Sequence, residues 1–111
     1  MILGKKMVFK EIARLTDISE GTMKQIDFGK SEILLVNFEG IIYAISNRCG
    51  HMDAPLSNGT LEGKIIECSL HSAQFDVTTG KNIRPSDMGE PTFNLKIYEV
   101  KVETGLIKLK F

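Results

Sequence analysis

Residues 97–111, IYEVKVETGLIKLKF, decide the fold class of this chain. Apolar and charged side chains alternate on both sides of Thr104-Gly105, a dipeptide that suits a tight turn. The apolar positions are Tyr98, Val100, Val102, Ile107, Leu109 and Phe111. A period of two belongs to a strand with one buried face and one solvated face, so this stretch predicts a β-hairpin.

Further strands are predicted upstream by short β-rich runs that end at turn residues. Gly29-Lys30 separates two such runs, and Glu39-Gly40 leads into a third. The runs cover residues 6–15, 22–28, 31–38, 41–46, 64–67 and 74–77. Apolar residues at 12, 15 and 18 also leave a helix open near the first run, because periodicity is ambiguous over short stretches. The expected fold is all-β, with an antiparallel meander over residues 22–46.

Composition and charge are those of one ordinary folded domain. The chain has 111 residues, of which 42% are hydrophobic and 25% are charged. Lys and Arg total 14 and balance 14 Asp and Glu, so global charge favours neither nucleic acid nor an anionic membrane as a partner. No apolar run approaches the roughly 18 residues of a membrane span. We therefore expect one cytoplasmic domain, residues 1–111, that binds no nucleic acid and no membrane.

The middle of the chain, residues 47–91, is rich in turn residues and short of strands. Its glycines and prolines are Gly50, Gly59, Gly63, Gly80, Gly89, Pro55, Pro85 and Pro91. Most of the glycines are interpreted as turn residues with positive φ. Long loops cost ordering entropy and bury little, so a segment of this kind needs another source of stability. A bound metal centre would provide it.

All cysteines and histidines of the chain lie in two short clusters within this segment. Cys49 and His51 form one cluster, and Cys68 and His71 form the other. A structural disulfide is a poor interpretation for a cytoplasmic chain, where thiols stay reduced. Thiolate and imidazole together suit zinc, copper or an iron–sulfur cluster. The residue types alone leave these metals open.

The spacing favours two metal ions over one. Structural zinc sites usually draw ligand pairs with wider spacings, such as C-x₂₋₄-C. A Cys-x-His pair is cramped around a single tetrahedral ion, whereas two bridged irons let each loop send its cysteine to one iron and its histidine to the other. A mononuclear zinc or copper site, a catalytic Cys–His pair and a chance arrangement are the alternatives.

The full pattern, C-x-H-x₁₆-C-x₂-H, resembles the signature of Rieske [2Fe–2S] proteins, in which two histidines replace two cysteines on one iron. Residues 16–22, 58–81 and 96–109 are also similar to small Rieske ferredoxins of bacterial aromatic-ring dioxygenases. The resemblance implies a Rieske fold, with an antiparallel β-sandwich or barrel-like base. Two loops would form a small cluster-binding subdomain at about residues 47–85.

The resemblance also implies a role for each ligand of one [2Fe–2S] cluster. Cys49 and Cys68 would bind the inner iron. His51 and His71 would bind the outer iron through Nδ1, near the protein surface. Two neutral ligands leave less negative charge on that iron, so the added electron would localise there. A third, proline-containing loop covers the cluster in this family, and residues 84–91 are the candidate.

The chain departs from the Rieske proteins of respiratory and photosynthetic membrane complexes at four positions. Ala54 and Leu70 stand where those proteins have a disulfide, and Ala73 and Phe75 stand where they have a serine and a tyrosine hydroxyl near sulfur. Hydrogen bonds to sulfur raise the reduction potential. The midpoint potential is therefore expected at the low end of the Rieske range, roughly −150 mV.

The resemblance implies an electron carrier and not an enzyme. The chain would pass single electrons from a reductase to a terminal oxygenase or a related oxidoreductase through transient complexes. Met52 and Leu70 are candidates for an apolar docking rim. One alternative is a permanently bound small Rieske subunit of an oxidoreductase such as nitrite reductase, and a lesser one is a structural zinc module. Colour and metal content of the purified protein separate the zinc module from the others.

Overall fold

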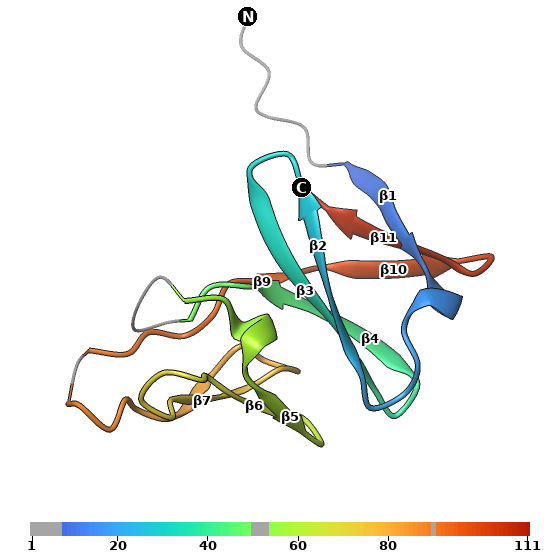
Figure 1. Ribbon diagram of the computed structural model, residues 1–111. Coiled ribbons are helices and arrows are strands. Elements are labelled where there is room, and N and C mark those ends of the chain that lie inside the picture. The colour runs from blue at the N-terminus through green and yellow to red at the C-terminus, as the bar shows by residue number, and fades with distance from the viewer. Residues whose placement is uncertain (1–7, 50–53, 90) are drawn as a thin grey trace, which may run out of the picture.

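The computed structural model describes residues 8–49, 54–89 and 91–111, and these residues form an almost purely β structure (Figure 1). The elements are β1 (Phe9–Arg14), η1 (Leu15–Asp17), β2 (Met23–Phe28), β3 (Ser31–Phe38), β4 (Ile41–Ser46), η2 (Leu56–Asn58), β5 (Thr60–Glu62), β6 (Ile65–Glu67), β7 (Gln74–Asp76), β8 (Asn82–Arg84), β9 (Ile97–Tyr98), β10 (Val100–Glu103) and β11 (Leu106–Lys110). The two η elements are single turns of 3₁₀-helix. The all-β prediction is confirmed.

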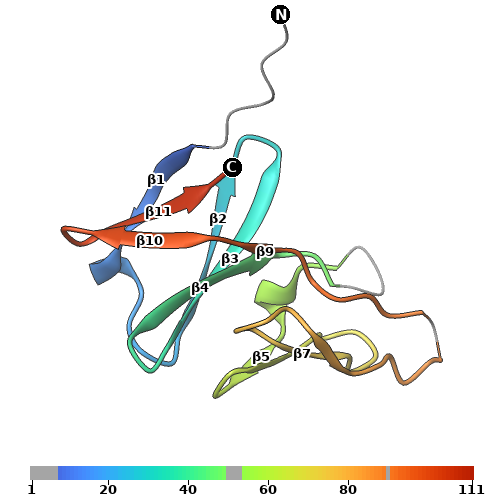
Figure 2. The same ribbon diagram turned by 180° about the vertical axis from the view of Figure 1, so that it is seen from behind.

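The described residues form three antiparallel sheets. The strand orders are β1-β11-β10, β2-β3-β4-β9 and β5-β6-β7-β8. The first two sheets form the β base, and the third belongs to the middle segment of the chain, which lies to one side of the base in both views (Figure 1 and Figure 2). The predicted meander is β2-β3-β4, with turns at Gly29-Lys30 and Glu39-Gly40.

Strand β3 joins the two hydrophobic cores because both of its faces are buried. Ile33 and Leu35 pack in one core with Ile107 and Leu109 of β11. Leu34 and Val36 point the other way, into a core that also contains both cysteines. The members of this second core are Leu34, Val36, Ile45, Cys49, Ala54, Leu56, Ile66, Cys68, Ala73, Phe75, Val77 and Leu95. The continuous run ILLV thus connects the base to the cysteine loops through packed side chains.

The structure differs from the sequence-based expectations at several local points. The helix considered near residues 12–18 is only the single turn η1, after strand β1. Val102 is 42% exposed, because β10 is the edge strand of its sheet and Val102 lies next to the hairpin turn. The three-residue strands β5 and β8 were too short to show a period in the sequence. In the part of the chain described here, no helix is long and apolar enough to cross a membrane.

Asp76 organises the tight turn that follows β7. Its Oδ1 accepts hydrogen bonds from the N–H (2.8 Å) and the hydroxyl (2.6 Å) of Thr78, and its Oδ2 lies 3.4 Å from Lys64 Nζ. Burial opposes ionisation of Asp76, but the hydrogen bonds from Thr78 and the charge of Lys64 outweigh it, so the pKa of Asp76 is lowered. The ionised carboxylate therefore stabilises the folded state.

We expect Asp76→Asn to lower the free energy of unfolding at neutral pH by about 1 kcal/mol, since the amide keeps an acceptor for Thr78 and loses the charge. Because the folded pKa is depressed, this contribution is present above the unfolded value of about 3.9 and is lost as pH falls through the folded pKa. Thermal unfolding at several pH values measures the difference in unfolding free energy between the unchanged protein and Asp76→Asn, and this difference should become smaller in acid. Asp27→Asn, at an exposed carboxylate on β2, is the control. If this difference became larger in acid, the ionised Asp76 carboxylate would not be the stabilising group.

Candidate metal centre

Two short loops of the same design carry the cysteines. The Cys49 N–H donates to the Ala54 carbonyl oxygen at 2.8 Å, and the Cys68 N–H donates to the Ala73 carbonyl oxygen at 2.8 Å. Each loop is therefore a cysteine and an alanine five residues later, closed by one backbone hydrogen bond. The two cysteines and two alanines are all buried in the same core.

Each loop is held by a pair of antiparallel chain segments. The second loop connects β6 to β7, where Glu67 pairs with Gln74. The first loop follows β4, and an isolated bridge between Arg48 and Pro55 stands at its base. The sequence folds this way because apolar residues on each side, such as Leu56 and Ile66, are fully buried beside the cysteines.

The two thiols meet in the apolar space between the loops. Both cysteines are in the thiol form, and Cys68 is only 1% exposed. Burial raises the pKa of the Cys68 thiol to about 11; the N–H of Leu70 opposes the shift, and the neighbouring Cys49 adds to it. Two buried thiols that interact across facing loops are a ready pair of soft ligands for one metal ion.

His71 follows Cys68 on the same loop, in an uncommon backbone conformation. Its φ is 62° and that of Ser72 is 59°, values that side-chain-bearing residues rarely adopt. The His71 carbonyl oxygen accepts a hydrogen bond from the Asp87 N–H at 2.8 Å. Strained backbone of this kind often marks a functional site.

The contact with Asp87 brings residues 84–89, the described start of the predicted third loop, to the second cysteine loop. The described part of this third loop is held by the Arg84–Asp87 ion pair (2.9 Å) and by the bond from the Ser86 N–H to Thr92 Oγ1 (3.2 Å). The segment proposed from the sequence to cover the cluster is therefore hydrogen-bonded to His71.

The structure brings together two of the four predicted ligands, Cys49 and Cys68, and places His71 on the same loop as Cys68. His51 lies outside the described residues, as do Gly50, Met52 and Asp53. Within the described ranges, no group of three His, Cys, Asp or Glu side chains is arranged to hold a metal ion. The pair of thiols is the metal-binding unit that the described residues present.

The chemistry of this donor set fits an iron–sulfur cluster. Two uncharged thiols with an apolar surround can be buried, whereas two bare thiolates could not, because burying unpaired charge is expensive. Ferric iron supplies the positive charge that lets both sulfurs ionise, and the Leu70 N–H already donates to the Cys68 sulfur.

The four positions that depart from the membrane-complex branch lie in different surroundings. Ala54 is buried, while Leu70 is 45% exposed. Ala73 and Phe75 are fully buried in the core that contains both cysteines. At these four positions the side chains therefore bring hydrocarbon and no hydroxyl.

The midpoint potential should consequently lie at the low end for this type of centre, roughly −150 mV. Phe75→Tyr, which adds one hydroxyl beside the cysteines, should raise it by about 40 mV, equivalent to about 1 kcal/mol for one electron. Protein-film voltammetry measures both values. A strongly positive midpoint of the unchanged protein near neutral pH would contradict the expectation.

An all-β base with two cysteine loops on one side is the architecture of a small iron–sulfur protein that holds its cluster between two loops. The Rieske [2Fe–2S] domain matches residues 8–99. The chain belongs to the Rieske [2Fe–2S] family, and its cofactor is one Rieske-type cluster.

Curated relatives of known systems resemble the chain over most of its length. The ferredoxin component of the naphthalene 1,2-dioxygenase system of Pseudomonas putida is 43% identical over 84% of this chain and 86% of the relative. The ferredoxin component of biphenyl 2,3-dioxygenase of Rhodococcus jostii is 39% identical over 68% of this chain and 70% of the relative. These relatives are named as ferredoxins and not as catalytic oxygenases.

Solved structures agree with the fold. The ferredoxin of carbazole 1,9a-dioxygenase from Nocardioides aromaticivorans has a TM-score of 0.80 and 30% identity, covering 91% of this chain and 95% of that chain. The ferredoxin of Sphingomonas yanoikuyae B1 has a TM-score of 0.82 over 92% and 97% of the two chains; at 24% identity it supports the fold alone.

Sequence reasoning missed Asn47, the buried polar residue beside the first loop. Its hydrogen bonds reach Glu32 and Ser57, which are distant along the chain. The only signal in the sequence is that it lies two residues before Cys49.

Proposed function

We propose that this chain is a one-electron carrier that receives electrons from a reductase and passes them to the terminal oxygenase of an aromatic-ring dioxygenase system. The observation that carries the proposal is the pair of buried cysteines on two facing loops, in a chain that matches ferredoxin components over most of its length. The transient partner complexes follow from this role, because a carrier must dissociate after each transfer.

We propose Cys49, His51, Cys68 and His71 as the four ligands, within a single Rieske domain of residues 1–111 whose cluster-binding subdomain spans about residues 47–85. The buried thiols support the two cysteine assignments. When bound, the cluster supplies a centre that takes up and releases one electron. The chain's own residues would hold it, with the fully buried Phe75 and Leu56 excluding water from the core that contains both cysteines, and His71 half-buried on the second loop.

The proposed location is the cytoplasm. Cysteine thiols that serve as ligands persist in a reducing compartment, where disulfide formation does not compete.

The test begins with the purified protein. It should be red-brown, contain two irons and two acid-labile sulfides per chain, and accept one electron from dithionite. With the reductase and terminal oxygenase of the P. putida naphthalene system, it should restore product formation in the absence of their own ferredoxin. A colourless zinc protein would overturn the proposal. A chain purified from its native cell only in a stable complex would instead favour a permanent Rieske subunit.

A further inference from the structure

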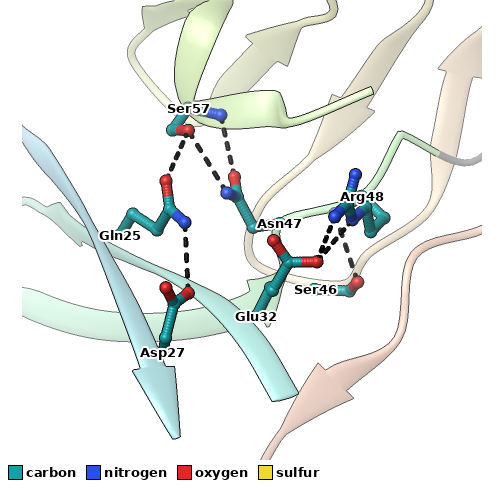
Figure 3. A network of polar contacts seen from close by, with 7 residues as sticks. All are labelled: Gln25, Asp27, Glu32, Ser46, Asn47, Arg48 and Ser57. Carbon is teal, nitrogen blue, oxygen red and sulfur yellow. Dashed lines mark hydrogen bonds and ion pairs between the residues drawn. The ribbon is translucent and has the colours of Figure 1, made fainter. Parts of the chain in front are cut away.

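Asn47 is a fully buried polar residue at the junction between the β base and the first cysteine loop. Its side chain is 0% exposed, and both ends of its amide bind Ser57: Nδ2 donates to Ser57 Oγ at 3.2 Å, and Oδ1 accepts the Ser57 N–H at 2.8 Å (Figure 3). Its backbone N–H donates to the Glu32 carbonyl oxygen at 2.9 Å, and its carbonyl oxygen accepts the Leu56 N–H at 2.9 Å. Asn47 therefore ties together three separate segments.

These bonds form the foot of a short ladder that ends at Cys49. Asn47 pairs with Leu56 and Ser57, Arg48 forms a bridge with Pro55, and the Cys49 N–H bonds Ala54. The three steps follow one another along the two segments without a gap. The position of Cys49 thus depends on the pairing of residues 47–49 with residues 54–57. The Asn47 amide supplies the side-chain hydrogen bonds of this pairing.

The same junction is anchored on the strands of the base. Ser57 Oγ donates to Gln25 Oε1 on β2 at 3.1 Å, and Gln25 Nε2 donates to Asp27 Oδ1 at 3.1 Å (Figure 3). Glu32 of β3 accepts from Asn47 through its backbone and from Arg48 Nε through its carboxylate at 2.6 Å. Gln25 and Asp27 are exposed, so their hydrogen bonds contribute little to the stability of this junction. The bonds of buried Asn47 contribute most of it.

We propose that Asn47 is a positioning residue for the iron–sulfur cluster, acting through Cys49. The proposal rests on the ligand assignment made above. Removing the amide leaves the Ser57 N–H without its partner next to the first cysteine loop, so the segment pair that carries Cys49 keeps its backbone bonds and loses its side-chain bonds. The β2-β3-β4 meander keeps its own hydrogen bonds and both cores. Cluster retention therefore depends on Asn47 more strongly than the stability of the base does.

Asn37 offers a matched control. It is a buried asparagine, 5% exposed, at the opposite end of β3 from Glu32. Its Nδ2 donates to the Ile18 carbonyl oxygen at 2.9 Å, and its Oδ1 accepts the Gly40 N–H at 3.0 Å. It has the same side chain and two side-chain hydrogen bonds, but its partners all belong to the base.

The experiment compares Asn47→Ala with Asn37→Ala in the cluster-loaded protein. Cluster release into a chelator is followed by visible absorbance, at the same interval below each variant's own far-UV unfolding midpoint. We expect release about tenfold faster for Asn47→Ala, the effect of leaving one buried group unpaired, and within about twofold of the unchanged protein for Asn37→Ala. The EPR g-values of the reduced protein should shift only for Asn47→Ala, since a purely structural loss would not move them.

Equal release rates and unchanged g-values for the two variants would overturn the proposal. If Asn47→Ala does not fold, Asn47→Ser decides, because its shorter side chain is polar but does not reach the Ser57 N–H as Oδ1 does; release at the unchanged protein's rate would then overturn the proposal. An unchanged protein without iron and sulfide would instead defeat the proposed function, so the two failures are distinguishable.

Discussion

Replacing Cys68 by alanine is expected to give a chain that folds its β base and holds neither iron nor sulfide. The thiol is buried against Cys49 between the two loops, and under the proposed assignment the remaining three ligands would leave one iron without its second cysteine. The substitution removes only one sulfur atom from the apolar core, so the metal-free chain loses one of its two buried thiols and little packing. Iron and sulfide analysis, visible absorbance and far-UV CD measure the two effects separately.

Leu70→Ala is the matched control for Cys68→Ala. Leu70 lies on the same loop, between Cys68 and His71, and its side chain is partly exposed. We expect the Leu70 variant to keep a full complement of iron and sulfide. If Cys68→Ala retained the cluster, or if both variants lost it equally, Cys68 would not be a ligand and the loss would report on loop folding alone.

The two clusters of cysteine and histidine could be recognised in the sequence because their spacing is local. Cys68 and His71 are three residues apart, and a two-residue alternation is enough to show β10 and β11. Likewise, the run Ile33–Val36 reads as a strand, although its burial on both faces became visible only with the two cores in place.

What the sequence could not show depends on contacts between distant segments. Asn47 looks like any loop asparagine until Ser57 and Glu32 lie beside it. The strands β5 and β8 have three residues each, and tertiary pairing, not propensity, makes them strands.

The glycines show the same limit. Gly63 and Gly80 have φ of 60° and 77°, which confirms the turn interpretation. For Gly59 that interpretation is wrong, because its φ is −87°, a value open to any residue. Its need for glycine comes from space: a Cβ at this position would lie 2.0 Å from the Glu67 carbonyl oxygen. Glu67 immediately precedes Cys68, so the backbone of the second cysteine loop begins where Gly59 leaves room.

Gly59→Ala should therefore be among the most damaging single substitutions in the chain. The clashing atom is backbone, so no side-chain rotation relieves it; β6 must move away from η2, and Cys68 moves with it. We expect a loss of more than about 3 kcal/mol, at or beyond the usual range for overpacking, with an unfolding midpoint lower by on the order of 10 °C or more. Thermal unfolding by CD and iron content per chain measure it.

Gly21→Ala separates this steric effect from the ordinary cost of losing a glycine. Gly21 has a φ of 78°, and a Cβ there would meet nothing within 4 Å, so only backbone strain opposes alanine. That strain costs about 1–2 kcal/mol and lies in the base, away from the cysteines, so this variant should keep its full iron content. The order of the two variants is decisive: if Gly59→Ala unfolded no earlier than Gly21→Ala and kept its iron, the close approach of Gly59 to Glu67 would not constrain the second cysteine loop.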